Sequence, residues 1–207
     1  NAPWWPEPED KFSRSDRPQW IEETCIWGLT GGGPESVVEP TKRFAEYMDL
    51  PTAVHWYNWH QIPFDDDYPH YFPTKEGFAE GVAELQAAGV PVTPYINGRL
   101  WDTDTESFAT EGIKYCTKDR EGKPYIEVYG SKQELAPMCP TQEYWRQILY
   151  DLVLRLVDEV GVDGVYMDQI SAARPRLCYD AIHGHPLVGG HWWVDGYWNL
   201  LERIQAG

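Results

Sequence analysis

The sequence has few basic residues. Its 17 Lys and Arg stand against 33 Asp and Glu, which gives a formal net charge of −16 at pH 7. A nucleic-acid-binding protein needs a basic surface to neutralise phosphates, and an anionic membrane surface selects for basic residues in the same way. No apolar run is long enough to span a bilayer. We therefore expect neither a nucleic-acid partner nor a membrane partner.

Cysteine is also scarce. The four cysteines, Cys25, Cys116, Cys139 and Cys178, are widely scattered and lack the short paired spacings typical of a zinc site. Cys116 and Cys139 could pair across one long loop, but free buried thiols agree with the sequence at least as well. Cysteine usage therefore leaves the compartment open, with a secreted or periplasmic location slightly favoured.

Several cofactor-binding and catalytic motifs are absent. There is no Ser-centred elbow, no P-loop and no Cys-x-x-Cys pair. The acidic run at 65–67 lacks the spaced ligands of an EF-hand, so we interpret it as a solvated loop. His183, His185 and His191 are a permitted metal-ligand set, but their Gly and Pro neighbours indicate a tight loop that contacts substrate. We predict no cofactor and no metal, and keep a metal-dependent hydrolase built on these histidines as a rival.

Aromatic residues, in contrast, are abundant: the chain has 11 Trp, 13 Tyr and 6 Phe. Some of them cluster with His and Asn at 55–60 (His-Trp-Tyr-Asn-Trp-His) and at 191–193 (His-Trp-Trp). Flat rings beside hydrogen-bonding groups suit a ligand with apolar faces and many hydroxyls, which describes a carbohydrate. Core packing alone is the alternative explanation.

Strand-like and helix-like segments alternate along most of the chain. Residues 1–19 are rich in Pro and charge, and we expect an extended arm or linker there. A long insertion containing a hairpin at 117–129 is expected before the third helix. Apolar periodicity and turn residues predict strands at 24–29, 52–59, 90–96 and 162–167, and helices at 41–48, 74–89, 141–160 and 194–204.

Four strand–helix repeats predict an α/β fold with a parallel sheet and right-handed crossovers. A complete (β/α)8 TIM barrel has eight such repeats in about 250 residues. We therefore interpret residues 20–207 as the N-terminal half of a β/α barrel. An open four-stranded sheet is the alternative, although the sequence lacks a glycine-rich phosphate loop or switch-point motif that would support it.

Asp168 is the leading catalytic candidate. It follows the apolar run at 162–167, which is typical of a buried parallel strand. Barrel enzymes place catalytic groups at the C-terminal ends of such strands, where a carboxylate can attack an anomeric carbon. A helix N-cap or an ion-pair partner is the alternative role. Asp163, at the other end of the strand, fits a turn or cap better.

The ends of the other predicted strands supply candidates for substrate binding. Alternate residues of 55–60 lie on opposite faces, and the sequence does not say which set faces the rim. Asn97 and Arg99 would bind hydroxyls. Trp101 would stack on a ring, and Asp102 would bind two hydroxyls. The predicted substrate-binding residues are Trp27, His55, Trp56, Asn58, His60, Asn97, Arg99, Trp101, Asp102, Tyr166, Gln169, His191 and Trp192.

Four segments together resemble a known family. They are 27–29 (Trp-Gly-Leu), 55–60, 95–99 (Tyr-Ile-Asn-Gly-Arg) and 163–169 (Asp-Gly-Val-Tyr-Met-Asp-Gln). These segments resemble barrel glycoside hydrolase-like proteins with a DUF6259-type domain, distant relatives of α-galactosidases and endo-α-N-acetylgalactosaminidases. The resemblance covers about residues 20 to 207 and is strongest at 163–169.

The resemblance implies a TIM barrel and a substrate that is an oligo- or polysaccharide. It maps the nucleophile, an Asp at the end of strand four, onto Asp168, and it places the acid/base on a later strand, beyond Gly207. α-Galactosidases usually carry a Lys two residues before this Asp, whereas this chain has Tyr166. The missing C-terminal half of the barrel is then an expected partner. We predict a retaining glycoside hydrolase; a non-catalytic carbohydrate-binding or degenerate barrel is the alternative.

Overall fold

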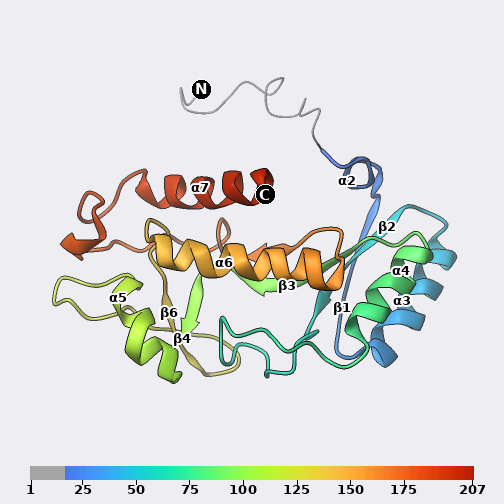
Figure 1. The fold of residues 1–207 in the computed structure, drawn as a ribbon, viewed down its shortest axis with the longest axis horizontal. Coiled ribbons are helices and arrows are strands. Elements are labelled where there is room, and N and C mark those ends of the chain that lie inside the picture. The colour runs from blue at the N-terminus through green and yellow to red at the C-terminus, as the bar shows by residue number, and fades with distance from the viewer. Residues whose placement is uncertain (1–16) are drawn as a thin grey trace.

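The computed structural model describes residues 17–207, and a parallel sheet lies at its centre (Figure 1). The sheet has the strand order β1-β2-β3-β7, and all neighbouring pairs are parallel. This confirms the α/β fold and the parallel sheet. The strands are β1 (Ile26–Gly31), β2 (Thr52–Tyr57), β3 (Val92–Asn97) and β7 (Tyr166–Asp168).

The arm predicted at residues 1–19 falls mostly outside the described residues. Gln19, its last residue, instead begins the short helix α2 (Gln19–Glu23). The paired strands run in the same direction, from Ile26 opposite Thr52 to Asn97 opposite Asp168. Their carboxyl ends therefore lie at one edge of the sheet, which is where α/β proteins place their sites.

Helices cover one face of this sheet. Helices α3 (Pro34–Met48) and α4 (Phe78–Ala87) lie side by side at one end, and α6 (Glu143–Arg155) runs on into a π-helical turn, η2 (Leu156–Val160). Apolar side chains from these helices bury against β2 and β3, and this burial is the main source of stability. The core includes Val37, Val38, Val54, Trp56, Phe78, Val82, Leu85, Val92, Ile96, Leu152 and Leu156.

Two helix starts differ from the prediction. Helix α3 begins at Pro34, not at residue 41, and continues through Pro40 because Val37 and Val38, which are 0% and 5% exposed, pack on the sheet. Helix α4 begins after Gly77, whose φ of 75° suits glycine, rather than at Thr74. The side chain of Thr74 therefore does not cap α4.

The segment between β3 and α6 forms a second, antiparallel sheet in the order β4-β6-β5. The predicted hairpin at 117–129 was only partly correct, because one bridge joins Lys118 to Pro124 while β5 pairs with β6. The strands are β4 (Leu100–Asp102), β5 (Glu127–Val128) and β6 (Glu134–Pro137). Two short helical turns, η1 (Phe108–Gly112) and α5 (Ile113–Tyr115), lie between β4 and β5.

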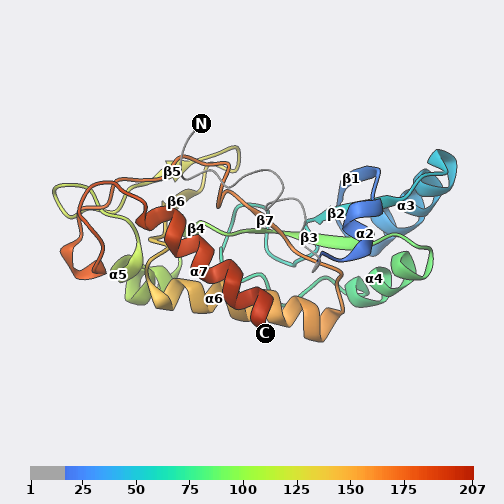
Figure 2. The same cartoon turned by 90° about the horizontal axis from the view of Figure 1, so that it is seen from above.

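The last helix, α7 (Trp192–Ala206), follows a long loop that contains the turn η3 (Ala181–His183). Helix α7 packs beside α6, as Figure 2 shows from above. Together with the insertion they bury a second core around Trp101, Trp145 and Trp193. Among residues 17–207, none of the helices combines the length and the apolar character needed to cross a bilayer.

Candidate active site at the strand ends

Asp168 lies at the C-terminal end of β7, opposite Asn97 of β3. The Gln169 N–H donates to Asp168 Oδ1 over 2.8 Å, and the Tyr95 hydroxyl donates to Oδ2 over 3.5 Å. The Gly98 N–H holds the backbone carbonyl of Asp168 at 3.0 Å. The side chain is only partly buried. The carboxylate is therefore fixed in direction and still accessible, which a nucleophile requires.

The face of the sheet opposite to the helices carries five rings: Trp27, His55, Tyr57, Tyr95 and Tyr166. Trp27 stacks on His55 with ring centroids 4.5 Å apart, and His55 lies 4.5 Å from Tyr166. Tyr57 stacks on Tyr95 at 4.5 Å, and Tyr95 lies 5.8 Å from Tyr166. Alternate residues of a strand share a face, so the four strands present these rings together. We call this surface the aromatic face; Asp168 lies at its edge.

Burial shifts the pKa of three groups on the aromatic face: it raises the pKa of Tyr57 and also acts on His55 and Tyr95. It lowers the pKa of His55, whose Nδ1 lies 2.6 Å from Thr93 Oγ1, so the ring is neutral at pH 7. Burial, reinforced by the charges of neighbouring groups that include Asp168, raises the pKa of Tyr95. Tyr95 therefore stays protonated and can donate its hydrogen bond to Asp168.

A second carboxylate, Asp65, lies near Asp168. Burial raises the pKa of Asp65, hydrogen bonds from Tyr68 and Ser131 oppose the rise, and the charge of Asp168 adds to it. Asp65 is only 8% exposed. The interpretation of 65–67 as a solvated loop is therefore wrong for Asp65.

Arg99 is buried and paired. Its Nη1 and Nη2 donate to the two oxygens of Glu127 in β5, at 2.6 and 2.8 Å, and Arg176 forms a second ion pair with Glu127. Burial alone raises the pKa of Glu127, but the hydrogen bonds, led by that from Arg99, lower it to about 2. The terminal nitrogens of Arg99 thus join two sheets.

A hollow of about 400 Å³ lies beside this ion pair. Glu127, Tyr129, Gln169 and Arg174 contribute to its lining. Gln169 directly follows Asp168, and its Oε1 lies 3.4 Å from both Arg99 Nη1 and the Tyr129 hydroxyl. The residue that directly follows β7 therefore lines the hollow.

Several predicted substrate-binding residues lie away from the aromatic face. Trp56 and His60 are 0% exposed; Trp56 faces the helices and packs edge-on against Phe78, 4.9 Å away. The imidazole of His60 is held by the carbonyl of Ile62. Strand alternation explains the difference, because His55 and Tyr57 take the face that Trp56 does not. We leave Trp56 and His60 out of the proposed site.

Four more predicted residues have structural contacts. Trp101 is 2% exposed and lies in the second core, and the Asp102 carboxylate accepts the N–H groups of Asp67 and Asp104 at 2.8 and 3.0 Å. Trp192 is buried at the start of α7, where exposed His191 pairs with Asp195 at 2.6 Å. These contacts engage both carboxylate oxygens of Asp102 and the Nδ1 atom of His191.

The two predicted asparagines end their strands. Asn97 Oδ1 accepts the N–H groups of Arg99 and Leu100 at 2.9 and 3.0 Å, which turns the chain from β3 into β4. Asn58 follows β2 with a φ of 53°. Both residues therefore shape the backbone turns at the carboxyl ends of β3 and β2.

Sequence reasoning did not select Tyr57, Tyr95, Asp65 or Glu127. Tyr57 and Tyr95 could have been found, because each is two residues from a selected residue of its strand, His55 or Asn97, and so shares its face. Glu127 and Asp65 carry no comparable signal, because only the tertiary fold brings them to the strand ends.

Known structures share this fold. The ligand-free α-N-acetylgalactosaminidase NagBb from Bifidobacterium bifidum matches with a TM-score of 0.73 at 11% identity, over 87% of this chain and 34% of that chain. The α-galactosidase TtGalA from Thermus thermophilus, bound to p-nitrophenyl α-D-galactopyranoside, gives 0.59 at 16% identity, over 88% and 36%. A GH31 sulfoquinovosidase from E. rectale gives 0.60 at 16% identity, over 90% and 29%. The chain is thus an α/β protein with the parallel-sheet fold of these glycosidases.

The family is clear from sequence. Residues 1–207 match DUF6259, described as a domain of unknown function, and the chain belongs to this family. A Bacteroides thetaiotaomicron protein named "Putative glycoside hydrolase" is 39% identical over 195 residues, which are 93% of this chain and 29% of that protein. A Monosiga brevicollis protein, "Putative glycoside hydrolase 22789", is 33% identical over 97% of this chain and 19% of its own length. The chain thus spans less than a third of either relative.

Proposed function

We propose that this protein is a glycoside hydrolase in which Asp168 is the nucleophile and the aromatic face binds the sugar. The observation that carries the proposal is the hydrogen-bonded, partly accessible Asp168 carboxylate at a parallel strand end, beside Tyr95 and Tyr166. The names of the two curated relatives and the fold shared with known glycosidases support it.

In this proposal residues 20–207 form the N-terminal half of a β/α barrel. Within the part of the chain that the structure describes, β1 and β7 each pair with a strand on one side only. Trp27 and Leu29 of β1 remain 39% and 70% exposed. A barrel closes such edges by adding strands, and it fills its interior with the side chains that point inward. Both features agree with further strands that would complete the barrel.

The proposed reaction is a double displacement. Asp168 Oδ2 attacks the anomeric carbon, the glycosidic C–O bond breaks, and a carboxylic acid protonates the leaving oxygen. Water then attacks the glycosyl–Asp168 ester, and the former acid, now a carboxylate, takes up the water proton. In retaining enzymes the two carboxyls lie about 5–5.5 Å apart. We place the acid/base on a segment that follows residue 207, as the resemblance implies.

The substrate that fits this face is an uncharged oligo- or polysaccharide. The rings of Trp27 and Tyr57 can pack on the apolar face of a sugar, and the Asp65 carboxylate can accept hydrogen bonds from hydroxyls. The hollow beside Gln169 would hold a neighbouring sugar unit. Tyr166 places a neutral ring where α-galactosidases usually carry a lysine. The identity of the sugar is therefore determined by testing a panel of substrates.

The test uses the protein at its natural length and a panel of aryl α- and β-glycosides and oligosaccharides. Asp168→Asn should lower turnover by about three orders of magnitude or more, while calorimetry still detects sugar binding. Asp163→Asn is the matched control, because Asp163 precedes β7 and its Oδ2 accepts the N–H of Val92, the first residue of β3, over 2.8 Å. Turnover that survives Asp168→Asn would refute the nucleophile. Sugar binding without hydrolysis of any substrate would show that the protein is a carbohydrate-binding protein and not a hydrolase.

A further inference from the structure

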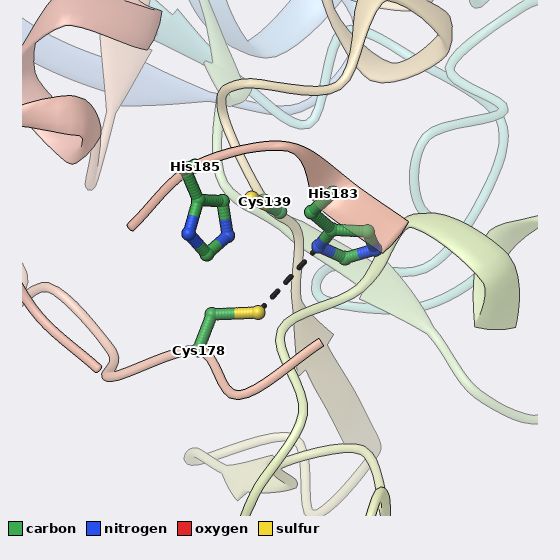
Figure 3. Close-up of side chains that lie close together, drawn as sticks. All are labelled: Cys139, Cys178, His183 and His185. Carbon is green, nitrogen blue, oxygen red and sulfur yellow. Dashed lines mark hydrogen bonds between the residues drawn. The ribbon is translucent and has the colours of Figure 1, made fainter. Parts of the chain in front are cut away.

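Four metal-ligating side chains converge outside the proposed active site. Cys139 lies just before α6, while Cys178, His183 and His185 belong to the loop between β7 and α7 (Figure 3). One ligand atom from each residue lies within 4.8 Å of the other three. The sequence shows no zinc spacing because 38 residues separate the two cysteines, and the fold brings them together.

The spacing of these atoms fits a tetrahedral zinc ion. Zinc lies about 2.3 Å from a thiolate sulfur and about 2.0–2.1 Å from an imidazole nitrogen, so a sulfur and a nitrogen on one ion are about 3.6 Å apart. Cys178 Sγ lies 3.5 Å from His183 Nδ1. The cluster therefore needs only small side-chain adjustments to surround an ion.

Hydrogen bonds select the nitrogen that each imidazole presents. His183 Nε2 lies 3.0 Å from the carbonyl of Lys114, to which it donates, and this leaves Nδ1 for a metal. His185 Nδ1 lies 2.8 Å from the carbonyl of Pro186, and this leaves Nε2. A metal-bound histidine usually donates its other N–H in this way.

His185 Nε2 supplies an independent observation. This atom is buried and has no hydrogen-bond partner among residues 17–207, and such an atom costs free energy unless something binds it. The ring itself is held in place, because it stacks on Trp192 with centroids 3.9 Å apart and planes inclined by 8°. The structure thus points a fixed, unsatisfied nitrogen into the cluster.

The backbone around the cluster is ordered by contacts of its own. Cys178 exchanges two backbone hydrogen bonds with Val188, at 3.0 and 2.9 Å. Asp180 caps η3 through the Ile182 N–H at 3.0 Å and pairs with Lys118 at 2.6 Å. Both cysteines of the cluster are 0% exposed and neither is in a disulfide. The ligands are therefore arranged in advance.

We propose that Cys139, Cys178, His183 and His185 bind one Zn²⁺ ion in a structural site. Two sulfur and two nitrogen ligands in a tetrahedral arrangement select zinc, and four protein ligands leave no open position for catalysis. The ion ties the loop after β7 to the start of α6. The same loop carries Arg174 and Arg176, so the ion also fixes one wall of the hollow beside Gln169. His191, which pairs with Asp195, is not a ligand.

The first test measures metal in the purified protein. Elemental analysis by mass spectrometry should find about one zinc per chain, as a four-ligand site requires. After the zinc is removed with a chelator, the thermal midpoint should fall and recover on adding Zn²⁺. Added Co²⁺ should give the intense visible absorption of a tetrahedral thiolate complex. Protein that contains no zinc and binds neither Zn²⁺ nor Co²⁺ would overturn the proposal, as would a Cys139–Cys178 disulfide found by peptide mapping.

Variants identify the ligands. Cys178→Ser and His185→Gln should lower zinc affinity at least about tenfold, the smallest loss expected even for an outer-shell change. Cys116→Ser and His191→Gln are the matched controls, since Cys116 is equally buried and His191 lies six positions after His185. Equal zinc loss in the controls would contradict the assignment. If a ligand variant fails to fold, the zinc content and the cobalt spectrum of the wild-type protein decide whether the site exists.

Discussion

The Arg99 guanidinium and the Glu127 carboxylate meet through two hydrogen bonds of 2.6 and 2.8 Å. Their side chains are 1% and 9% exposed. Arg99 lies between β3 and β4, and Glu127 lies in β5, so the pair joins the parallel sheet to the antiparallel sheet. Arg99 therefore stabilises the junction of the two sheets, and its binding of substrate stays a prediction.

Removing the carboxylate should destabilise the protein strongly. Glu127→Ala leaves the buried guanidinium of Arg99 without its counter-charge, which costs about 3–5 kcal/mol. Urea denaturation measures the free energy of unfolding. The control is Glu159→Ala, because the Arg155–Glu159 pair is exposed and such pairs contribute about 0–1 kcal/mol. Equal losses of unfolding free energy in the two variants would show that the buried pair stabilises the protein no more than the exposed pair.

The same pair predicts a pH dependence. The pKa of Glu127 is about 2 in the folded protein against an ordinary value of 4.5. A carboxylate with a lowered folded pKa adds stability above its unfolded pKa, and that stability is lost as the pH falls through the folded pKa. The stability difference between wild type and Glu127→Gln should thus be constant above pH 4.5 and shrink from pH 4.5 to about 2. Denaturation curves across this range test it; a difference that does not change with pH would contradict it.

Tyr95 should act as a positioning residue for Asp168. Its hydroxyl donates to Asp168 Oδ2 over 3.5 Å, so Tyr95→Phe removes a contact to the attacking oxygen and keeps the ring. We expect kcat to fall about tenfold, equivalent to about 1.4 kcal/mol, with little change in KM. Tyr57→Phe is the control, because the Tyr57 hydroxyl bonds to Tyr166. Changes in kcat and KM that are equal in both variants would show that Tyr95 acts through packing and not by positioning Asp168.

Local sequence patterns predicted the parallel strands and the end of β7. Apolar runs bounded by turn residues located all four strands, although β7 begins at Tyr166 and not at Val162, and Asp168 closes it. The start of α3 was missed because local rules end a helix near Pro40, whereas burial of Val37 and Val38 outweighs the lost hydrogen bond. The start of α4 was missed because Gly77 rather than Thr74 precedes the helix.

Contacts between distant segments could not be predicted in this way. Glu127 reaches Arg99 from an insertion, and Cys139 meets His185 although α6, η2, β7 and η3 lie between them in the sequence. Within its own segment of the sequence, each of these residues is an ordinary polar or cysteine residue with no pattern that indicates its partner. One aspect of the site was open to the sequence: alternation already divided 55–60 into two faces, and the structure selects the face with His55 and Tyr57.

The most direct test of the proposed mechanism is to trap the glycosyl–enzyme intermediate. A 2-deoxy-2-fluoro glycoside of the sugar that the protein hydrolyses slows the second displacement, so the covalent ester accumulates. Peptide mass spectrometry should then find one added glycosyl group on the peptide that contains Asp168, and the substrate should prevent the labelling. A label on a different carboxylate, or hydrolysis with inversion and no label, would contradict Asp168 as the nucleophile.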